Sequence, residues 1–244
     1  MIGFFKIILY EPLLNLLVVF YNLIPGHDLG IAIIFLTLVL KLLLFPLSRQ
    51  SIKSQKSLKE LQPKIQELKK KYANQKDKQA QAMMNLYKEN KVNPFSSCLP
   101  LLIQLPILIS VFQVFRVGLT AASLPVYSFI SNPGTLNVMA FGVLNLASPS
   151  PILAIITGIL QYVQMKAFTT QQPSKKLVKK DGAKDENMMA TMNKQMKFMM
   201  PALTVFIGMT LPSGLMLYWL ASLLFTILEQ KLVFAVSSKK ITNP

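Results

Sequence analysis

The sequence predicts an all-α polytopic membrane protein: a five-transmembrane-helix bundle with a cytosolic helical hairpin and an N-terminal interfacial helix. Three observations lead to this fold class. Of the 244 residues, 52% are hydrophobic and only 15% are charged, whereas nearer a quarter are charged in a soluble domain. Five apolar stretches approach the length of about 20 residues that crosses a bilayer. The Lys and Arg residues, which outnumber the acids to give a net charge of +16, gather in a few segments.

The five apolar stretches set the domain organisation. The fourth is short and is followed by Leu211–Gly214, whose Pro and Gly are typical of a tight turn, so we expect the fourth and fifth spans to form a hairpin. The predicted spans are 29–48, 94–117, 151–169, 198–211 and 215–236. The segments around them are an N-terminal interfacial amphipathic segment (1–28), a cytosolic helical hairpin (49–93), an external loop (118–150), a cytosolic basic and Met-rich loop (170–197) and a cytosolic tail (237–244).

The distribution of basic residues predicts the orientation. Twelve of the 26 Lys and Arg residues lie between Arg49 and Pro94, and seven Lys lie between Thr170 and Lys197, whereas Val117–Ser150 has no Lys or Arg. Because basic loops stay in the cytoplasm, we expect an external N-terminus and a cytoplasmic C-terminus in a bacterial cell (inner) membrane. The positive charge is then a topology signal that also attracts anionic lipids, and no direct specific nucleic-acid binding is expected.

The N-terminal segment 4–23 allows two interpretations. It is apolar and long enough to span a membrane, but Glu11 and Pro12 sit at its centre, and Glu11, Asn15 and Asn22 fall on one helical face. This pattern favours a helix in the outer interface over a spanning helix. The segment is a poor signal peptide because no small-residue cleavage site follows it.

The basic segment 49–93 has the periodicity of two helices. Apolar residues recur at steps of three and four and resume after a break at 74–77, which predicts a helical hairpin packed stripe against stripe. The stripe residues are Leu58, Leu61, Ile65, Leu68 and Tyr72, then Ala80, Met83, Met84 and Tyr87. A plain helical spacer and a surface that receives a partner both remain open for this hairpin.

Polar residues inside the apolar stretches are the main functional signal. Lys41 falls near the middle of the first span, with Thr37 one turn earlier, and a charge there needs water or a partner. Lipid cannot satisfy such groups, so we expect them to face a polar cavity between the helices. The alternatives are snorkelling of Lys41 to the cytosol and ordinary interhelical hydrogen bonds for the amides and hydroxyls. The other members are Gln104 and Gln113; Thr157, Gln161 and Gln164; and Tyr218, Ser222, Thr226 and Glu229.

No enzyme chemistry is expected. The sequence lacks HExxH, GxSxG and a phosphate loop, and it has a single histidine, His27, and a single cysteine, Cys98. His27 and Asp28 are interpreted as a solvated turn and helix cap. We therefore expect no catalytic residues, no metal site and no cofactor. The competing function is a small-solute or ion transporter with a midplane Lys41 site, but the internal repeats usual in transporters are not recognisable here.

Several motifs taken together resemble the YidC/Oxa/Alb membrane protein insertase family, in its bacterial form without the large external domain. The resemblance covers nearly the whole chain, in order and with matching topology. The segments resembling the first conserved span, the hairpin and the next span are Lys41–Leu47 (KLLLFPL), Leu61–Ile65 (LQPKI), Met84–Lys88 (MNLYK), Asn93-Pro94 and Pro100–Ile107 (PLLIQLPI). Those resembling the last two spans are Phe198–Pro201 (FMMP), Phe206, Leu211–Leu215 (LPSGL) and Leu217–Trp219 (LYW).

The resemblance implies a five-helix bundle with a hydrophilic groove that opens to the cytoplasm and to lipid and is closed outside. Lys41 occupies the place of the family's usual Arg; it keeps the charge but lacks the planar fork of a guanidinium. The same resemblance implies that the groove is lined or flanked by Thr37, Gln104 and Tyr218. The expected client-binding groove is Lys41, Thr37, Gln104, Gln161, Gln164, Tyr218 and Ser222.

The function expected from these features is insertion of other membrane proteins. Short hydrophilic segments of clients would pass through the groove, and their hydrophobic segments would enter lipid. Expected partners are nascent or newly made membrane proteins and membrane lipids, with the Sec translocon and the ribosome left open. Flexible Met side chains suit varied apolar clients, although an amphipathic lead-in to the fourth span explains part of the pattern equally well. The expected cytosolic capture residues are Met83, Met84, Met188, Met192 and Met196.

Overall fold

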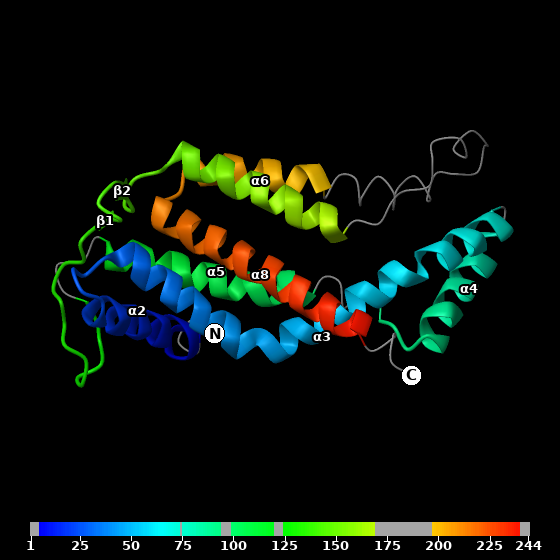
Figure 1. Cartoon of the computed structure of the whole chain (residues 1–244), viewed down its shortest axis with the longest axis horizontal. Helices are drawn as coiled ribbons and strands as arrows, with labels where there is room; N and C mark the ends of the chain where they lie inside the picture. Colours follow the sequence, from blue (N-terminus) through cyan, green and yellow to red (C-terminus); the bar gives the residue numbers. More distant parts are fainter. Residues whose placement is uncertain (1–4, 74, 94–98, 120–123, 169–196, 240–244) are drawn as a thin grey trace.

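Helices make up most of the computed structural model, which describes residues 5–73, 75–93, 99–119, 124–168 and 197–239. The molecule is an elongated bundle with α4 projecting at one end and a small β-ribbon at the other (Figure 1). The helices are η1 (Lys6–Tyr10, a π-helical turn), α2 (Glu11–Leu23), α3 (Leu29–Lys71), α4 (Lys76–Glu89), α5 (Leu99–Gly118), α6 (Pro151–Phe168), the helix Lys197–Gly208, and α8 (Ser213–Lys239). The strands β1 (Met139–Ala140) and β2 (Leu144–Asn145) pair antiparallel.

The described helices have the length and composition of membrane spans. Three are long and apolar enough to cross a membrane, namely Lys6–Leu23, α3 and Ser213–Phe234, and Leu102–Gly118 and Lys197–Gly208 are shorter apolar helices. Large apolar side chains also point outward from the bundle: Leu43 is 69% exposed, Ile159 60% and Leu232 61%. A soluble protein rarely presents so much apolar surface. The chain is therefore an all-α membrane protein, as predicted.

Helix α3 joins the first predicted span to the hairpin without a break. It runs for 43 residues and contains Pro46 and Pro63. Its N-terminus is capped by Asp28, whose Oδ1 accepts a hydrogen bond of 3.0 Å from the backbone N–H of Ile31. After Lys71 the chain turns, and α4 packs back against the end of α3 (Figure 1). The helical hairpin is thus present, and its first helix is a continuation of the first predicted span.

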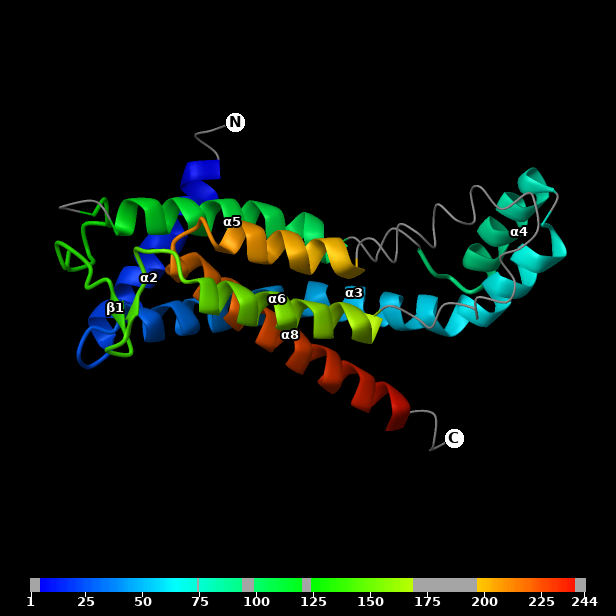
Figure 2. The ribbon, with the colours of Figure 1, turned by 90° about the horizontal axis from the view of Figure 1, so that it is seen from above.

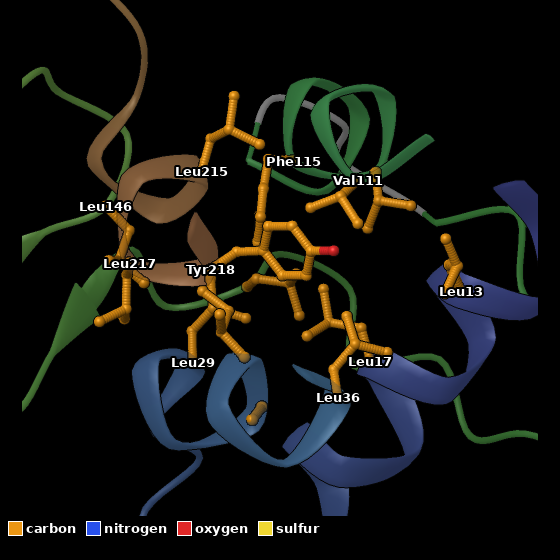
Figure 3. Close-up of a cluster of buried hydrophobic side chains, with 14 of the residues drawn as sticks. Leu13, Leu17, Leu29, Leu36, Val111, Phe115, Leu146, Leu215, Leu217 and Tyr218 are labelled. Atoms are coloured by element: carbon orange, nitrogen blue, oxygen red, sulfur yellow. The ribbon is translucent and has the colours of Figure 1, made fainter. Parts of the chain in front are cut away.

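The densest packing lies at the end of the bundle opposite the hairpin. Side chains from α2, α3, α5 and α8 meet around the ring of Tyr218 (Figure 3), and Leu17, Leu36 and Val111 there are fully buried. Helix α2 crosses this end of the bundle obliquely (Figure 2). Interlocking apolar side chains leave little room for water, so this end is closed.

The loop before α6 seals the same end through hydrogen bonds to three helices. Asn15 Oδ1 in α2 accepts the N–H of Tyr127 at 2.7 Å, and Asp28 Oδ2 at the start of α3 accepts the N–H of Phe141 at 2.6 Å. At the start of α8, the N–H of Gly214 donates to Leu146 O at 3.0 Å. Asp28, interpreted from sequence as a solvated turn and cap, therefore caps α3 and also anchors the loop.

Helix α6 and the helix Lys197–Gly208 lie side by side (Figures 1 and 2), with small residues at the contact. A Cβ built on Gly158 would clash with Val205 Cγ2, and one on Gly208 would lie 2.8 Å from Ala154 Cβ. Close backbone approach at Gly and Ala is the usual way in which helices associate in lipid. Helix α6 also packs against α8.

Candidate functional site

The clearest polar contact inside the bundle joins α3 to α8. Lys41 Nζ donates to Thr226 Oγ1 at 2.7 Å, and Ser48 Oγ donates to Glu229 Oε2 at 2.7 Å. We call these four residues the α3–α8 polar contact. Lys41 and Thr226 are half-buried, whereas Glu229 is only 7% exposed. A cation and an anion therefore lie in the same contact between two apolar helices.

Helical periodicity explains why these residues face one another. Lys41 and Ser48 are seven residues apart on α3, which is close to two turns, and Thr226 and Glu229 are about one turn apart on α8. Each pair therefore lies on one face of its helix. The two helices run in the same direction along the bundle (Figure 1), so the pairs meet in order along the chain.

The ammonium of Lys41 can make further hydrogen bonds. A lysine has three N–H donors, and Thr226 accepts one of them. The hydroxyl of Thr226 in turn donates to Ser222 O at 2.8 Å, one turn earlier on α8. Because Lys41 is only half-buried, its remaining donors can reach water or another molecule. A neutral hydroxyl is also a weaker partner for an ammonium than a carboxylate, because a carboxylate adds the attraction between two opposite charges.

A second polar pair joins α5 to α8. Gln104 Nε2 donates to the hydroxyl of Tyr218 at 3.0 Å. Tyr218 is 2% exposed and its ring lies in the apolar cluster (Figure 3), whereas Gln104 is half-buried. Tyr218 precedes Thr226 by eight residues, which is about 12 Å along α8. This pair therefore lies toward the closed end of the bundle, two turns from the α3–α8 polar contact.

A third pair joins α6 to the helix Lys197–Gly208. The hydroxyl of Thr204 contacts Gln161 Oε1 and also lies 3.0 Å from Met200 O. Gln161 is 6% exposed, whereas Gln164, about one turn further along α6, is half-buried. The amide of Gln161 thus binds a neighbouring helix, and neither helix of this pair carries Lys41 or Gln104.

The predicted site residues fall into these separate pairs, and some are satisfied within their own helix. Thr37 is fully buried and donates to Ile33 O at 2.7 Å, a bond that hydroxyls commonly make inside helices. Ser222 is 5% exposed, whereas Lys41, Gln104 and Gln164 are partly accessible. A single water-filled space shared by all seven residues stays a prediction.

Sequence reasoning left three members of the α3–α8 polar contact out of the site. Thr226 and Glu229 belong to the polar stripe recognised on the last span, but nothing in one sequence indicated that they, rather than Tyr218 and Ser222, are the partners of α3. Ser48 lies at the edge of an apolar stretch, and only its spacing of seven residues from Lys41 could have indicated it.

The predicted capture methionines are only partly described. Met83 is half-buried and Met84 is 49% exposed on α4. Met188, Met192 and Met196 lie outside the described residues. In the described part of the chain, no group of three or more His, Cys, Asp or Glu side chains is placed to hold a metal ion.

Comparison with known proteins places this arrangement in a family. The model of the family described as "60Kd inner membrane protein" matches residues 19–240. The membrane protein insertase YidC of Fusobacterium nucleatum is 35% identical over 83% of this chain and 84% of that protein. The YidC of Clostridium tetani is 35% identical over 88% of each chain.

Longer relatives match as well. The YidC of Geobacter metallireducens is 32% identical over 95% of this chain, but the chain spans only 38% of that protein. The match over residues 19–240 includes all four residues of the α3–α8 polar contact, together with Gln104 and Tyr218. The chain therefore belongs to the 60Kd inner membrane protein family, the YidC/Oxa/Alb family, whose curated members include these membrane protein insertases.

Proposed function

We propose that this protein is a membrane protein insertase and chaperone. It moves short hydrophilic segments of client proteins through a polar, cytosol-open groove within the membrane and releases their hydrophobic segments into lipid. The observation that carries the proposal is the half-buried Lys41, held inside the bundle by the hydroxyl of Thr226 on α8. The curated relatives of similar length, which are named insertases, support the same function.

The physical task of an insertase suits such a site. Polar or acidic groups of a client tail cannot enter hydrocarbon cheaply without a partner. A cation partway through the bilayer attracts an acidic tail and shortens the apolar part of its path. Burial of the client's own apolar segment in lipid then supplies the driving force, at about 25 cal/mol per Å² of apolar surface. This mechanism requires no nucleotide.

The depth of Lys41 supports the proposed groove. Lys41 follows the cap residue Asp28 by 13 positions, or about 20 Å of helix, in a hydrocarbon layer about 30 Å thick. Toward Asp28 the bundle is filled by the apolar cluster and sealed by the loop of residues 124–150. Access to Lys41 is therefore expected from the hairpin side, through a groove lined by Lys41, Gln104 and Gln164, with the buried Thr37, Gln161, Tyr218 and Ser222 in its walls.

The proposed orientation places the hairpin and the C-terminus in the cytoplasm and the N-terminus outside, in the inner membrane. The hairpin is the strongly basic part of the chain, and basic loops remain cytoplasmic. Helix α2 then lies in the outer interface. Its oblique course across the closed end (Figure 2) and the bond from Tyr127 to Asn15 support this position over a span.

The proposed partners are newly made membrane proteins and membrane lipids, with the Sec translocon and the ribosome as further candidates. Met84 on α4 is exposed and flexible enough to contact varied apolar segments. Together with Met83, Met188, Met192 and Met196, it would capture clients before they reach the groove.

Reconstitution tests the proposed function. Purified protein in liposomes, given a small single-span client with a short acidic tail, should make that tail resistant to added protease. Liposomes with a Lys41→Ala variant that is equally folded should protect less of the client, and liposomes without protein should protect little. Protection equal to that of empty liposomes would contradict the proposal and would favour the transporter.

A further inference from the structure

Glu229 is a buried acid that has no part in the mechanism proposed above. Its side chain lies in the interior between α3 and α8, and one carboxylate oxygen accepts the hydroxyl of Ser48 at 2.7 Å. A carboxylate inside a membrane bundle is costly unless a positive charge or several donors compensate it. The hydroxyl of Ser48 is an uncharged donor that leaves the negative charge of the carboxylate unbalanced, so Glu229 needs a cation nearby.

Lys41 is that cation. Its direct partner, Thr226, lies about one turn from Glu229 on α8, so Lys41 and Glu229 belong to the same contact between α3 and α8. The neighbouring cations Arg49 and Lys231 are exposed, where solvent or headgroups screen them. Lys41 and Glu229 thus form a balanced pair within the bundle, although the hydrogen bond of Lys41 goes to a neutral hydroxyl.

We propose that Glu229 is the resting counter-charge of Lys41 and sets how strongly the site prefers acidic client segments. An incoming carboxylate competes with Glu229 for the same ammonium. This inference rests on the proposed function and adds a specificity-determining residue to it. Glu229 acts by positioning and balancing Lys41, not by touching the client.

Ser48 keeps the carboxylate of Glu229 from pairing directly with Lys41, which leaves the ammonium able to bind a client. By donating to the carboxylate, it holds Glu229 toward α3 at a position one turn further along the bundle than Thr226. A carboxylate released from Ser48 could swing toward Lys41 and form a direct ion pair, which is stronger than a hydrogen bond with only one charged partner. In this geometry Glu229 balances the charge of Lys41 without a direct hydrogen bond, so the remaining N–H donors of the ammonium can bind a client carboxylate.

The test uses reconstituted protein and three clients that differ only in tail charge: acidic, neutral and basic. The readout is the ratio of acidic-tail to neutral-tail insertion, measured by protease protection. Glu229→Gln removes the competing charge and keeps an oxygen for Ser48, so the ratio should rise by about threefold, the effect of a weak ion pair. Glu229→Asp keeps the charge and should return the ratio to the wild-type value.

Ser48→Ala gives an independent measurement with the opposite sign. It leaves Glu229 in place but removes its hydrogen-bond donor, so the carboxylate can pair directly with Lys41 and the acidic-to-neutral ratio should fall. Alanine fits a helix well, so this variant also serves if Glu229→Gln fails to fold. A ratio unchanged in folded Glu229→Gln, or unchanged in Ser48→Ala, would overturn the inference.

The Lys41→Ala background separates this inference from the proposed function. There, Glu229→Gln should no longer change the ratio, because the cation it balances is gone. If Lys41→Ala itself leaves the ratio unchanged, the proposal that Lys41 attracts acidic tails is contradicted. If Lys41→Ala lowers the ratio while Glu229→Gln in the wild-type background does not raise it, only the role of Glu229 fails.

Discussion

The ammonium of Lys41 in α3 lies 2.7 Å from the hydroxyl of Thr226 in α8, although 185 residues separate the two in the chain. This hydrogen bond ties the long helix that continues into the hairpin to the last helix of the bundle. It lies between the packed, loop-sealed end and the hairpin end. In the proposed function, a charge placed there and bonded to a neutral hydroxyl is available to a client that arrives from the hairpin side.

The orientation can be tested with single cysteines in a Cys98→Ser background. A cysteine at Lys70, at the end of α3, should be protected from an impermeant maleimide in intact cells, because we propose that the basic hairpin is cytoplasmic. One at Ser131, in the loop at the closed end, should react. Both positions are exposed in the folded protein, so the contrast reports the membrane barrier alone. The reverse pattern would invert the proposed orientation.

The groove predicts a graded thiol reactivity. Cysteines at the half-buried Gln104 and Gln164 should react with a small charged thiol reagent added from the cytosolic side, and slowly from outside. A cysteine at Ser222, which is 5% exposed, is the matched control and should react more slowly from either side. Because a charged reagent does not enter lipid, unreactive Gln104 and Gln164 positions would indicate lipid-facing or packed side chains and would contradict the groove.

The packing of the loop at the closed end of the bundle depends on the absence of a side chain at Gly30. A Cβ at this position would lie 2.6 Å from Ala140 Cβ, so Gly30→Ala should push the loop away. We expect a lower thermal midpoint in detergent, since overpacking typically costs about 1–3 kcal/mol. Gly118→Ala is the control, because its Cβ would meet only Leu136 Cδ1 at 3.3 Å. Equal midpoints for the two variants would mean that the loop does not pack tightly on α3.

The Gln104–Tyr218 bond should contribute less than the packing of the ring. Tyr218→Phe removes the hydroxyl that accepts from Gln104, and a buried hydrogen bond of this kind contributes about 1 kcal/mol. Tyr218→Ala empties the centre of the apolar cluster and should cost about 3–5 kcal/mol, as large-to-small changes of aromatic residues do. Unfolding in denaturant measures both. A similar loss for the two variants would assign the stability to the hydroxyl instead.

Local sequence patterns were sufficient for much of this fold. Apolar composition and length predicted an all-α membrane protein, and steps of three and four predicted the helical hairpin in which Leu61 and Ile65 are buried. The same periodicity identified Tyr218, Ser222, Thr226 and Glu229 as one interior-facing stripe. These features depend on residues close together in the chain, which is why they can be recognised without a structure.

Pairings between distant segments could not be predicted in this way. Which member of the α8 stripe meets Lys41 depends on the register between α3 and α8, which no local pattern encodes. Gln161 contacts Thr204 on a helix that follows a long basic segment. The anchoring of Phe141 by Asp28 likewise depends on how a loop of 27 or more residues folds back over the bundle. Each of these contacts arises from the tertiary arrangement of the helices.

Charge reversal at Lys41 tests the central claim most directly. Reconstituted Lys41→Arg and Lys41→Glu proteins, each folded as judged by its thermal midpoint, are compared on one client carrying either an acidic or a basic tail. We expect Lys41→Arg to protect the acidic-tailed client as the wild type does, and Lys41→Glu to lose that client while gaining the basic-tailed one. Full insertion of the acidic-tailed client by folded Lys41→Glu would contradict an electrostatic role for Lys41 in the groove.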